Sequence, residues 1–189
     1  MEYLIDQVNW WDRFPYCPET RVEVSNDHEW LYLHYYVKGA QLRALTVEDQ
    51  GPVWEDSCVE FFCQVPGERH YMNFEVNCIG AMVASRRAGR AEEVVPLTAD
   101  ELALIRRHST YPREAITEQD GLFAWEVELA IPLRLIFREH QPVFPQKLRA
   151  NFYKCGDKTK LPHFVSWQPI PLASPDFHRP EYFGEIELT

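Results

Sequence analysis

The chain has 189 residues, of which 46% are hydrophobic and 14% are aromatic, and 29 acidic against 19 basic side chains give a formal net charge of -10. A single hydrophobic core stops growing only near roughly 250 residues, so we expect one domain over residues 1–189. The negative charge disfavours nucleic acids and anionic membranes as partners, since both would repel the protein over about a Debye length of 8 to 10 Å.

The N-terminal segment lacks the basic start, the long apolar run and the small-residue cleavage site of a signal peptide. No segment approaches the roughly 18 consecutive apolar residues of a membrane span. The chain as given is therefore expected in the cytoplasm, and export is expected only if the native start lies upstream.

Eight strand-like runs rich in Val, Tyr, Phe and Trp follow one another along the chain. They are residues 21–25, 30–37, 57–65, 70–78, 80–87, 122–131, 148–155 and 183–188. This pattern predicts an all-β fold, an antiparallel β-sandwich. Trp30 and Trp125 lie inside two of the runs and are expected to fill its core.

One short helix is predicted in a connection, over residues 98–108. Thr98 can cap its N-terminus, Glu101 can complete a capping box, and two arginines lie near its C-terminal end. A turn of helix is also predicted after Pro132.

Cysteine and histidine spacing gives no support for a disulfide framework or a metal site. The five cysteines are odd in number and without C-x-x-C spacing, so most are expected to be small core residues. The seven histidines show no H-E-x-x-H motif, and G-x-S-x-G, Walker and G-x-G-x-x-G motifs are absent. No cofactor is expected.

Residues 57–65 and 70–78 are predicted to form a hairpin around the connection "PGER". One face of this hairpin is apolar, with Phe61 opposite Phe74 and Val59 opposite Val76. The other face is polar and pairs Cys58 with Asn77, Glu60 with Glu75, Phe62 with Asn73, and Gln64 with Tyr71.

The opposed glutamates are the informative pair, because like charges directly across a ladder are destabilising unless a cation or a ligand relieves them. Arg86, Arg87 and Lys154 are candidate cations. The alternative is an ordinary solvated sheet face with surface salt bridges.

Two tryptophans are expected in loops. Trp54 precedes the hairpin, and Trp167 lies in a proline-rich segment, residues 162–184, that is predicted to be a long ordered loop. Aromatic faces against the C–H faces of a sugar ring, with carboxylates, amides and arginine around its hydroxyls, suit pyranose recognition. Each tryptophan can instead simply anchor its loop, so the prediction of a sugar site depends on their combination with the polar face.

The stretches "WEDSCVEFF", "YMNFEVNCIG", "WEVELAIP", "RANFYK" and "FHRPEYFGEIEL" resemble, nearly end to end, the family 9 carbohydrate-binding modules and the wider dopamine-β-monooxygenase N-terminal-like superfamily. The resemblance implies a jelly-roll-like β-sandwich without catalytic activity that holds a saccharide terminus between two tryptophans. Such modules serve bacterial polysaccharide utilisation, alone or attached to xylanases. A glycoside hydrolase acting on the same glycan is therefore an implied partner.

Carried over by this resemblance, the expected ligand-binding residues are Trp54, Glu60, Asn73, Glu75, Asn77, Arg86 and Trp167. The W-x5-E pattern of the family corresponds to Trp54 and Glu60, and Trp167 of "SWQP" is the candidate second tryptophan. Arg86 is carried over by general position on the strand after the hairpin, and Arg87 competes with it. Family members can bind structural calcium, but no D-x-D-x-D-G loop supports that here.

Three other functions stay open at this point. A protein-interaction module could use the loop tryptophans as binding hot spots. A glycoside hydrolase could use Glu60 and Glu75, which would have to lie about 5 to 9.5 Å apart. A haem-binding relative would need axial ligands such as His70, Met72 or Met82.

Overall fold

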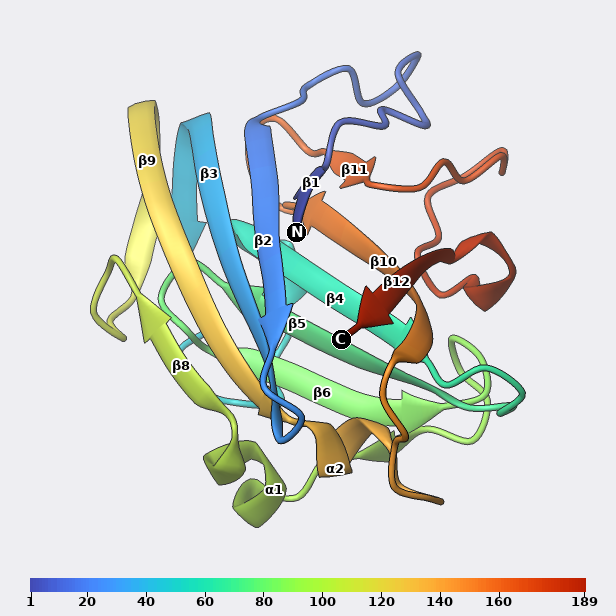
Figure 1. Ribbon diagram of the computed structural model, residues 1–189. Coiled ribbons are helices and arrows are strands. Elements are labelled where there is room, and N and C mark those ends of the chain that lie inside the picture. Colours follow the sequence, from blue (N-terminus) through green and yellow to red (C-terminus); the bar gives the residue numbers. More distant parts are fainter.

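A computed structural model describes residues 1–189, and its strands form two antiparallel sheets that pack face to face (Figure 1). The first, sheet A, has the order β1-β2-β3-β9-β8. Its strands are β1 (Glu2–Leu4), β2 (Glu19–Asn26), β3 (Trp30–Ala44), β8 (Arg106–Ser109) and β9 (Ile116–Pro132). The predicted β-sandwich is confirmed.

The second sheet, sheet B, has the order β11-β10-β4-β5-β6-β7, and β12 pairs with the first half of β10. Its strands are β4 (Cys58–Gln64), β5 (Tyr71–Asn77), β6 (Met82–Arg87), β7 (Val95–Pro96), β10 (Gln146–Cys155), β11 (Phe164–Ser166) and β12 (Gly184–Leu188). All eight predicted runs are strands, and β1, β7, β8 and β11 are additional.

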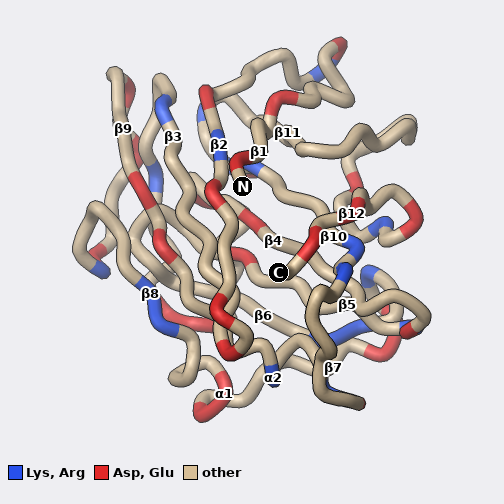
Figure 2. The backbone as a smooth tube through the Cα atoms, viewed as in Figure 1, with Lys and Arg blue, Asp and Glu red and all other residues tan.

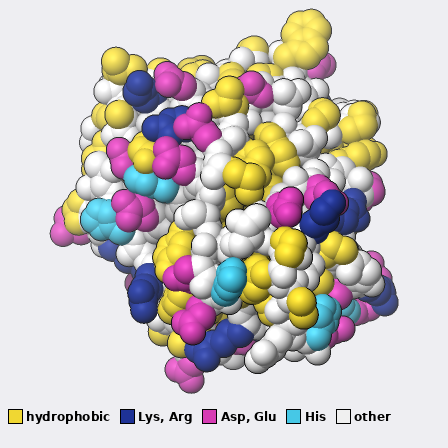
Figure 3. All heavy atoms as spheres, viewed as in Figure 1, with side chains coloured by type: hydrophobic (Ala, Val, Ile, Leu, Met, Phe, Trp, Pro, Cys, Tyr) yellow, Lys and Arg dark blue, Asp and Glu magenta, His cyan; other side chains and the backbone are white.

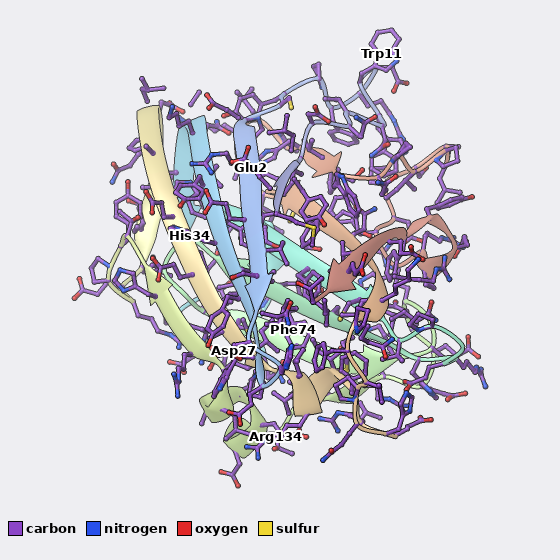
Figure 4. All side chains as sticks on the ribbon, viewed as in Figure 1. Glu2, Trp11, Asp27, His34, Phe74 and Arg134 are labelled. Atoms are coloured by element: carbon purple, nitrogen blue, oxygen red, sulfur yellow. The ribbon has the colours of Figure 1, made fainter.

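Strand β3 shows how the sequence assigns its faces. Side chains of a strand alternate between the two sides of the sheet. The inward positions are buried and apolar, namely Leu31, Leu33, Tyr35 and Val37. The outward positions are only half-buried, namely Trp30, Tyr32, His34 and Tyr36. Sheet A therefore presents one face to the core, where Phe74 of sheet B also lies (Figure 4), and one face to solvent.

The position of Trp30 corrects one prediction. Trp125 is buried in the core as predicted, but Trp30 lies on the outer face of sheet A with the Arg106 guanidinium 4.3 Å from its ring centroid. The neighbouring Leu31 takes the inward position, and alternation sends Trp30 outward.

Helix α1 (Ala99–Leu104) is shorter than predicted. Its capping box is present, with the Thr98 hydroxyl accepting from the backbone N–H of Glu101 and the Glu101 carboxylate accepting from the backbone N–H of Thr98. The helix ends early because Arg106–Ser109 pairs with β9 instead. The predicted helical turn is α2 (Leu133–Ile136), and short 3₁₀ turns occur at Val53–Glu55 (η1) and Pro180–Tyr182 (η2).

Four of the five cysteines are buried, Cys17 is exposed, and none forms a disulfide. No helix is both long and apolar enough to span a membrane.

Sheet B is covered on both faces, and this decides between the two interpretations of the polar face of the hairpin. Every residue of β4 and β5 is buried. A second hydrophobic cluster lies over their outer face, and it includes Trp10, Val53, Phe62, Tyr71, Tyr153, Ile170, Phe177 and Phe183. The proline-rich segment and the loop after β1 supply the cover, and the Trp10 indole N–H donates to the carbonyl of Leu172 at 2.7 Å. The hairpin face is therefore not an ordinary solvated surface.

Candidate functional site

The hairpin of β4 and β5 has the predicted register. Six residue pairs run from Cys58–Asn77 to Cys63–Met72 and include Glu60 opposite Glu75. The loops cover most of the outer face, and a pocket of about 250 Å³ reaches Glu60 and Glu75. The floor of this pocket includes Glu60, Glu75, Arg87 and Cys155, and its walls include Trp54, Asp157, Phe164, Phe177 and His178.

The two glutamates on the floor are almost fully buried. Oε1 of Glu60 accepts from Sγ of Cys155 at 3.0 Å, and Oε1 of Glu75 accepts from Nδ2 of Asn73 at 2.9 Å. The second oxygen of each carboxyl makes no hydrogen bond within the protein. Neither is sealed from solvent, since the one enclosed side-chain oxygen without a partner is Oε1 of Glu68, so both open to the pocket and are available to polar groups of a ligand.

Burial changes the protonation of the floor. It raises the pKa of the Glu60 carboxyl well above its usual range, and the neighbouring Cys155 and Glu75 add to the effect. Burial also raises the pKa of Glu75 to about 7, against the opposing influence of Arg87, and that of Asp157 on the wall to about 6. The like-charge pair is thus relieved largely by proton uptake, and a neutral carboxyl can both donate and accept hydrogen bonds.

Arg87 is tied to Glu75 through a chain of side-chain hydrogen bonds. Nε of Arg87 donates to Oγ of Ser85 at 3.0 Å, and Ser85 donates to Oδ1 of Asn73 at 2.7 Å. Asn73 in turn donates to Glu75. These bonds hold the half-buried Arg87 guanidinium in place on the floor. The guanidinium forms no ion pair with a carboxylate of the protein. Asn73 supports Glu75 from behind.

The structure does not bring Arg86 to the pocket. Arg86 pairs with Met72 in the register of β5 and β6, and Met72 belongs to the core face. The Arg86 guanidinium instead bonds to Glu139 at 2.5 Å. Adjacent strand residues point to opposite faces, so Arg87 takes the position expected of Arg86.

Lys154, a candidate cation for the glutamates, also lies on the core face of sheet B. Its register partner on β4 is Val59 of the core. The ammonium group donates to the carbonyl of Cys155 and to Nε2 of His163, both at 2.7 Å. It does not neutralise the glutamates directly.

Trp54 stands at the rim of the pocket with its side chain accessible. It lies in η1, and 38% of its surface is exposed. Its backbone is fixed, because the carbonyl of Trp54 accepts from the N–H of Asp157 at 3.0 Å and that of Glu55 accepts from Lys158 at 3.1 Å. The ring is therefore presented by a rigid turn.

Trp167 does not line the pocket. Its ring packs against the core side of sheet B, with centroids 4.7 Å from Tyr3 and 5.6 Å from Phe152. Trp167 therefore anchors the proline-rich segment and does not take the predicted role of second ligand-binding tryptophan. Phe164 and Phe177 supply the aromatic surface on that side of the pocket.

Asn77 is buried and supports the rim instead of facing the pocket. Its Nδ2 donates to the carbonyl of Thr46 at 2.8 Å and to Oδ2 of Asp56 at 3.0 Å. Asp56 also accepts from the backbone N–H groups of Leu45 and Thr46. These bonds fix the loop that carries η1 and Trp54.

Two polar wall residues have no signal in the sequence. Asp157 lies two residues after the end of β10, and the β4–β10 register could have suggested its position only once that pairing was known. His178 comes from the proline-rich segment, and Tyr71 bonds to its Nδ1 at 2.9 Å. Burial lowers the pKa of His178 to about 3, so its imidazole is neutral.

One group on the floor resembles a metal site in composition. Donor atoms of Cys58, Glu60 and Cys155 lie within 4.8 Å of one another. Burial raises the pKa of the Cys58 thiol to about 12 and that of Cys155 well above its usual range. Metal ligation needs thiolates, so an ion bound here would have to displace both thiol protons.

The sequence matches the profile described as carbohydrate-binding family 9 over residues 2–188. The chain belongs to carbohydrate-binding family 9. A crystal structure of a candidate carbohydrate-binding protein from Bacteroides uniformis is similar to this family 9 chain, with 37% identity and a TM-score of 0.94 over 100% of this chain and 86% of the other.

Two solved family 9 modules from Caldicellulosiruptor kristjanssonii share the fold of this family 9 chain. The one in complex with glucose has 12% identity and a TM-score of 0.61, and covers 99% of this chain and 83% of its own. The one in complex with cellotriose has 11% identity and a TM-score of 0.55, and the match covers 100% of this chain and 82% of the module. No curated protein matches the sequence.

Proposed function

We propose that this family 9 protein binds a saccharide in the pocket of sheet B without cleaving it. The observation that carries the proposal is the set of unpaired polar groups on the floor of the pocket. Glu60 and Glu75 present carboxyl oxygens without protein partners, and Arg87 presents a guanidinium without an ion pair, beneath the exposed ring of Trp54. Polar groups below and an aromatic face at the rim suit a sugar ring.

The size of the pocket favours one sugar unit. Its volume of about 250 Å³ lies just below the ~300–1,000 Å³ of most small-molecule sites. A monosaccharide or the terminal unit of a glycan would fit, and a long internal stretch of chain would not. A glycoside hydrolase acting on the same glycan is the natural partner of such a protein.

The arrangement of Glu60 and Glu75 supports binding over hydrolysis. They are direct cross-strand neighbours on one floor, so both approach a bound sugar from the same side. Glycosidases place their acid and their nucleophile or base on either side of the scissile bond. The alternative of haem binding finds no support either, because Met72 and Met82 are enclosed in the core and His70 pairs with Glu93 at 2.7 Å.

The proposal is tested with a panel of monosaccharides, xylo-oligosaccharides and cello-oligosaccharides, read out by tryptophan fluorescence and confirmed by calorimetry. A saturable change with one class of sugar is expected, because Trp54 lies at the rim. No response to any sugar by correctly folded protein would contradict saccharide binding. A protein-interaction module would then be the better interpretation.

A pair of neighbouring arginines gives a matched test of the pocket. Arg87→Gln is expected to lower saccharide affinity about tenfold, the loss of one hydrogen bond from a charged group. Arg86→Gln removes the same charge from the opposite face and should leave affinity unchanged. Calorimetric titration of both variants with the sugar found above measures the difference. Equal losses would show that overall charge, not contact, matters.

A further inference from the structure

The outer face of sheet A carries a row of alternating acidic and histidine side chains. By register, Glu23 of β2 pairs with His34 of β3, His34 pairs with Glu128 of β9, and Glu128 pairs with His108 of β8. Paired residues point to the same face of a sheet, so the row crosses four strands on the solvent side. It lies on the sheet opposite the saccharide pocket.

His34 lies at the centre of a tight group of metal-binding atoms. Its Nε2 is 2.8 Å from Oε2 of Glu126 and 3.8 Å from Oε1 of Glu128. All three donor atoms lie within 4.8 Å of one another. The side chains are 27%, 51% and 54% exposed in that order, so an ion can reach them. Figure 4 labels His34 on this face.

The surrounding surface is a groove and not a flat face. A hollow of about 510 Å³ is lined by Glu23, His34, His108 and Glu128 of the row, together with neighbours that include Tyr32 and Arg106. Figure 3 shows histidine and acidic side chains gathered on this face, over the strands of sheet A at the left of the view.

The orientation of the His34 ring is already fixed. Its Nδ1 lies 2.9 Å from the Tyr36 hydroxyl, and the two rings stack with centroids 4.0 Å apart. Tyr36 is itself held by the Arg21 guanidinium, 3.6 Å from its ring centroid. Without an ion, Nε2 carries a proton that it donates to the Glu126 carboxylate, which can only accept. An ion bound at Nε2 would displace this proton, and Nδ1–H would then donate to the Tyr36 hydroxyl, as metal-ligating histidines donate their second N–H to an oxygen partner.

The charges at the group are unbalanced. Glu23 is paired with Arg21 at 2.7 Å, but His34 is the sole ion-pair partner of both Glu126 and Glu128. Figure 2 shows acidic positions along β9. One imidazole cannot neutralise two carboxylates, whereas a divalent cation can.

We infer that His34, Glu126 and Glu128 form a binding site for a divalent transition-metal ion of the Zn²⁺ class. His108, which pairs with Glu128 from the neighbouring strand β8, is a further donor. Imidazole nitrogen with carboxylate oxygen suits Zn²⁺ and its neighbours, while Ca²⁺ prefers oxygen ligands alone. Both strands that supply the three donors are paired along their length, so the ion would bind to a preformed surface.

The inference is tested by calorimetric titration of metal-stripped protein with Zn²⁺ at about pH 7.5, where imidazole is mainly neutral. One equivalent is expected to bind. His34→Gln and Glu128→Gln should each lower the affinity about tenfold or more. His70→Gln is the matched control, since His70 also pairs with a glutamate, Glu93, but in the connections that precede β5 and β7. This variant should bind Zn²⁺ as the wild type does.

Titration with Co²⁺ separates this site from the buried cysteines of the pocket floor. Ligation by nitrogen and oxygen gives no thiolate-to-cobalt charge-transfer band, whereas ligation by Cys58 or Cys155 gives one. The inference would be overturned by absence of Zn²⁺ binding by the folded wild type or by a thiolate band. It would also be overturned if His34→Gln and Glu128→Gln both bound Zn²⁺ as tightly as the wild type. Melting curves of the variants establish that they are folded, and none of these outcomes depends on saccharide binding.

Discussion

Trp54→Ala is expected to weaken saccharide binding by about 1 to 3 kcal/mol, a loss of roughly 5- to 150-fold in affinity, without unfolding the protein. Trp54 presents an aromatic ring to the pocket, and 38% of the surface of this residue is exposed before any ligand binds. The contacts that hold its turn come from backbone carbonyls of Trp54 and Glu55, which alanine keeps. Removing the ring therefore removes ligand contact and little of the fold.

The control for this prediction is Trp11→Ala. Trp11 is also a loop tryptophan, 72% exposed, and projects from the loop after β1 (Figure 4). It does not line the pocket, so its removal should leave affinity unchanged. Calorimetry gives the affinities, and thermal melts check the folding of both variants. A large fall in the melting temperature of Trp54→Ala would instead make this ring a structural anchor.

Glu60→Gln is expected to stabilise the ligand-free protein at neutral pH. The pKa of Glu60 is raised well above the unfolded value of 4.5, chiefly by burial, so folding takes up a proton at pH values above 4.5. Stability linked to this group is fully present below pH 4.5 and is lost as the pH rises toward the folded pKa. Glutamine has no proton to take up and avoids this loss.

The size of the effect follows from the linkage relation. Each pH unit between the unfolded and the folded pKa costs about 1.4 kcal/mol, so Glu60→Gln should be more stable than wild type by on the order of 2 kcal/mol near pH 6. The advantage should vanish near pH 4. Burial raises the pKa of Glu75 to about 7 as well, and the two carboxyls are neighbours, so the difference between variant and wild type reports the change in the pair.

Urea unfolding of both proteins across this pH range measures the difference. Glu185→Gln serves as the control, because Glu185 is exposed and pairs only with the exposed Lys147. Its stability relative to wild type should not show this trend with pH. A less stable Glu60→Gln, or a difference independent of pH, would mean that Glu60 is ionised and stably paired in the folded protein.

The hairpin could be predicted in detail from sequence because its register depends on local information. A turn of fixed length and a period of two residues decide which side chains face each other, and Phe61, Phe74, Glu60 and Glu75 all lie as predicted. The capping box at Thr98 is local in the same sense. Arg86 was expected where Arg87 lies because it was carried over by general position, without a register between β5 and β6.

The walls of the pocket could not be predicted because they depend on contacts between segments far apart in sequence. The proline-rich segment contributes Phe177 and His178 only because it folds back over sheet B, and no periodicity marks which of its residues face inward. Trp167 shows the same difficulty, since a loop tryptophan suits a binding site and a loop anchor equally well. The elevated pKa values of the floor follow from that cover as well.

The cover over sheet B also determines how well ordered the pocket is before a ligand binds. Its walls rest on a hydrophobic cluster and on backbone hydrogen bonds to η1, so they are ordered before a ligand arrives. Little conformational entropy then remains to be lost on binding. Backbone amides of Asp157 and Lys158 should accordingly exchange slowly with solvent even in the free protein, with rates that change little when sugar is added.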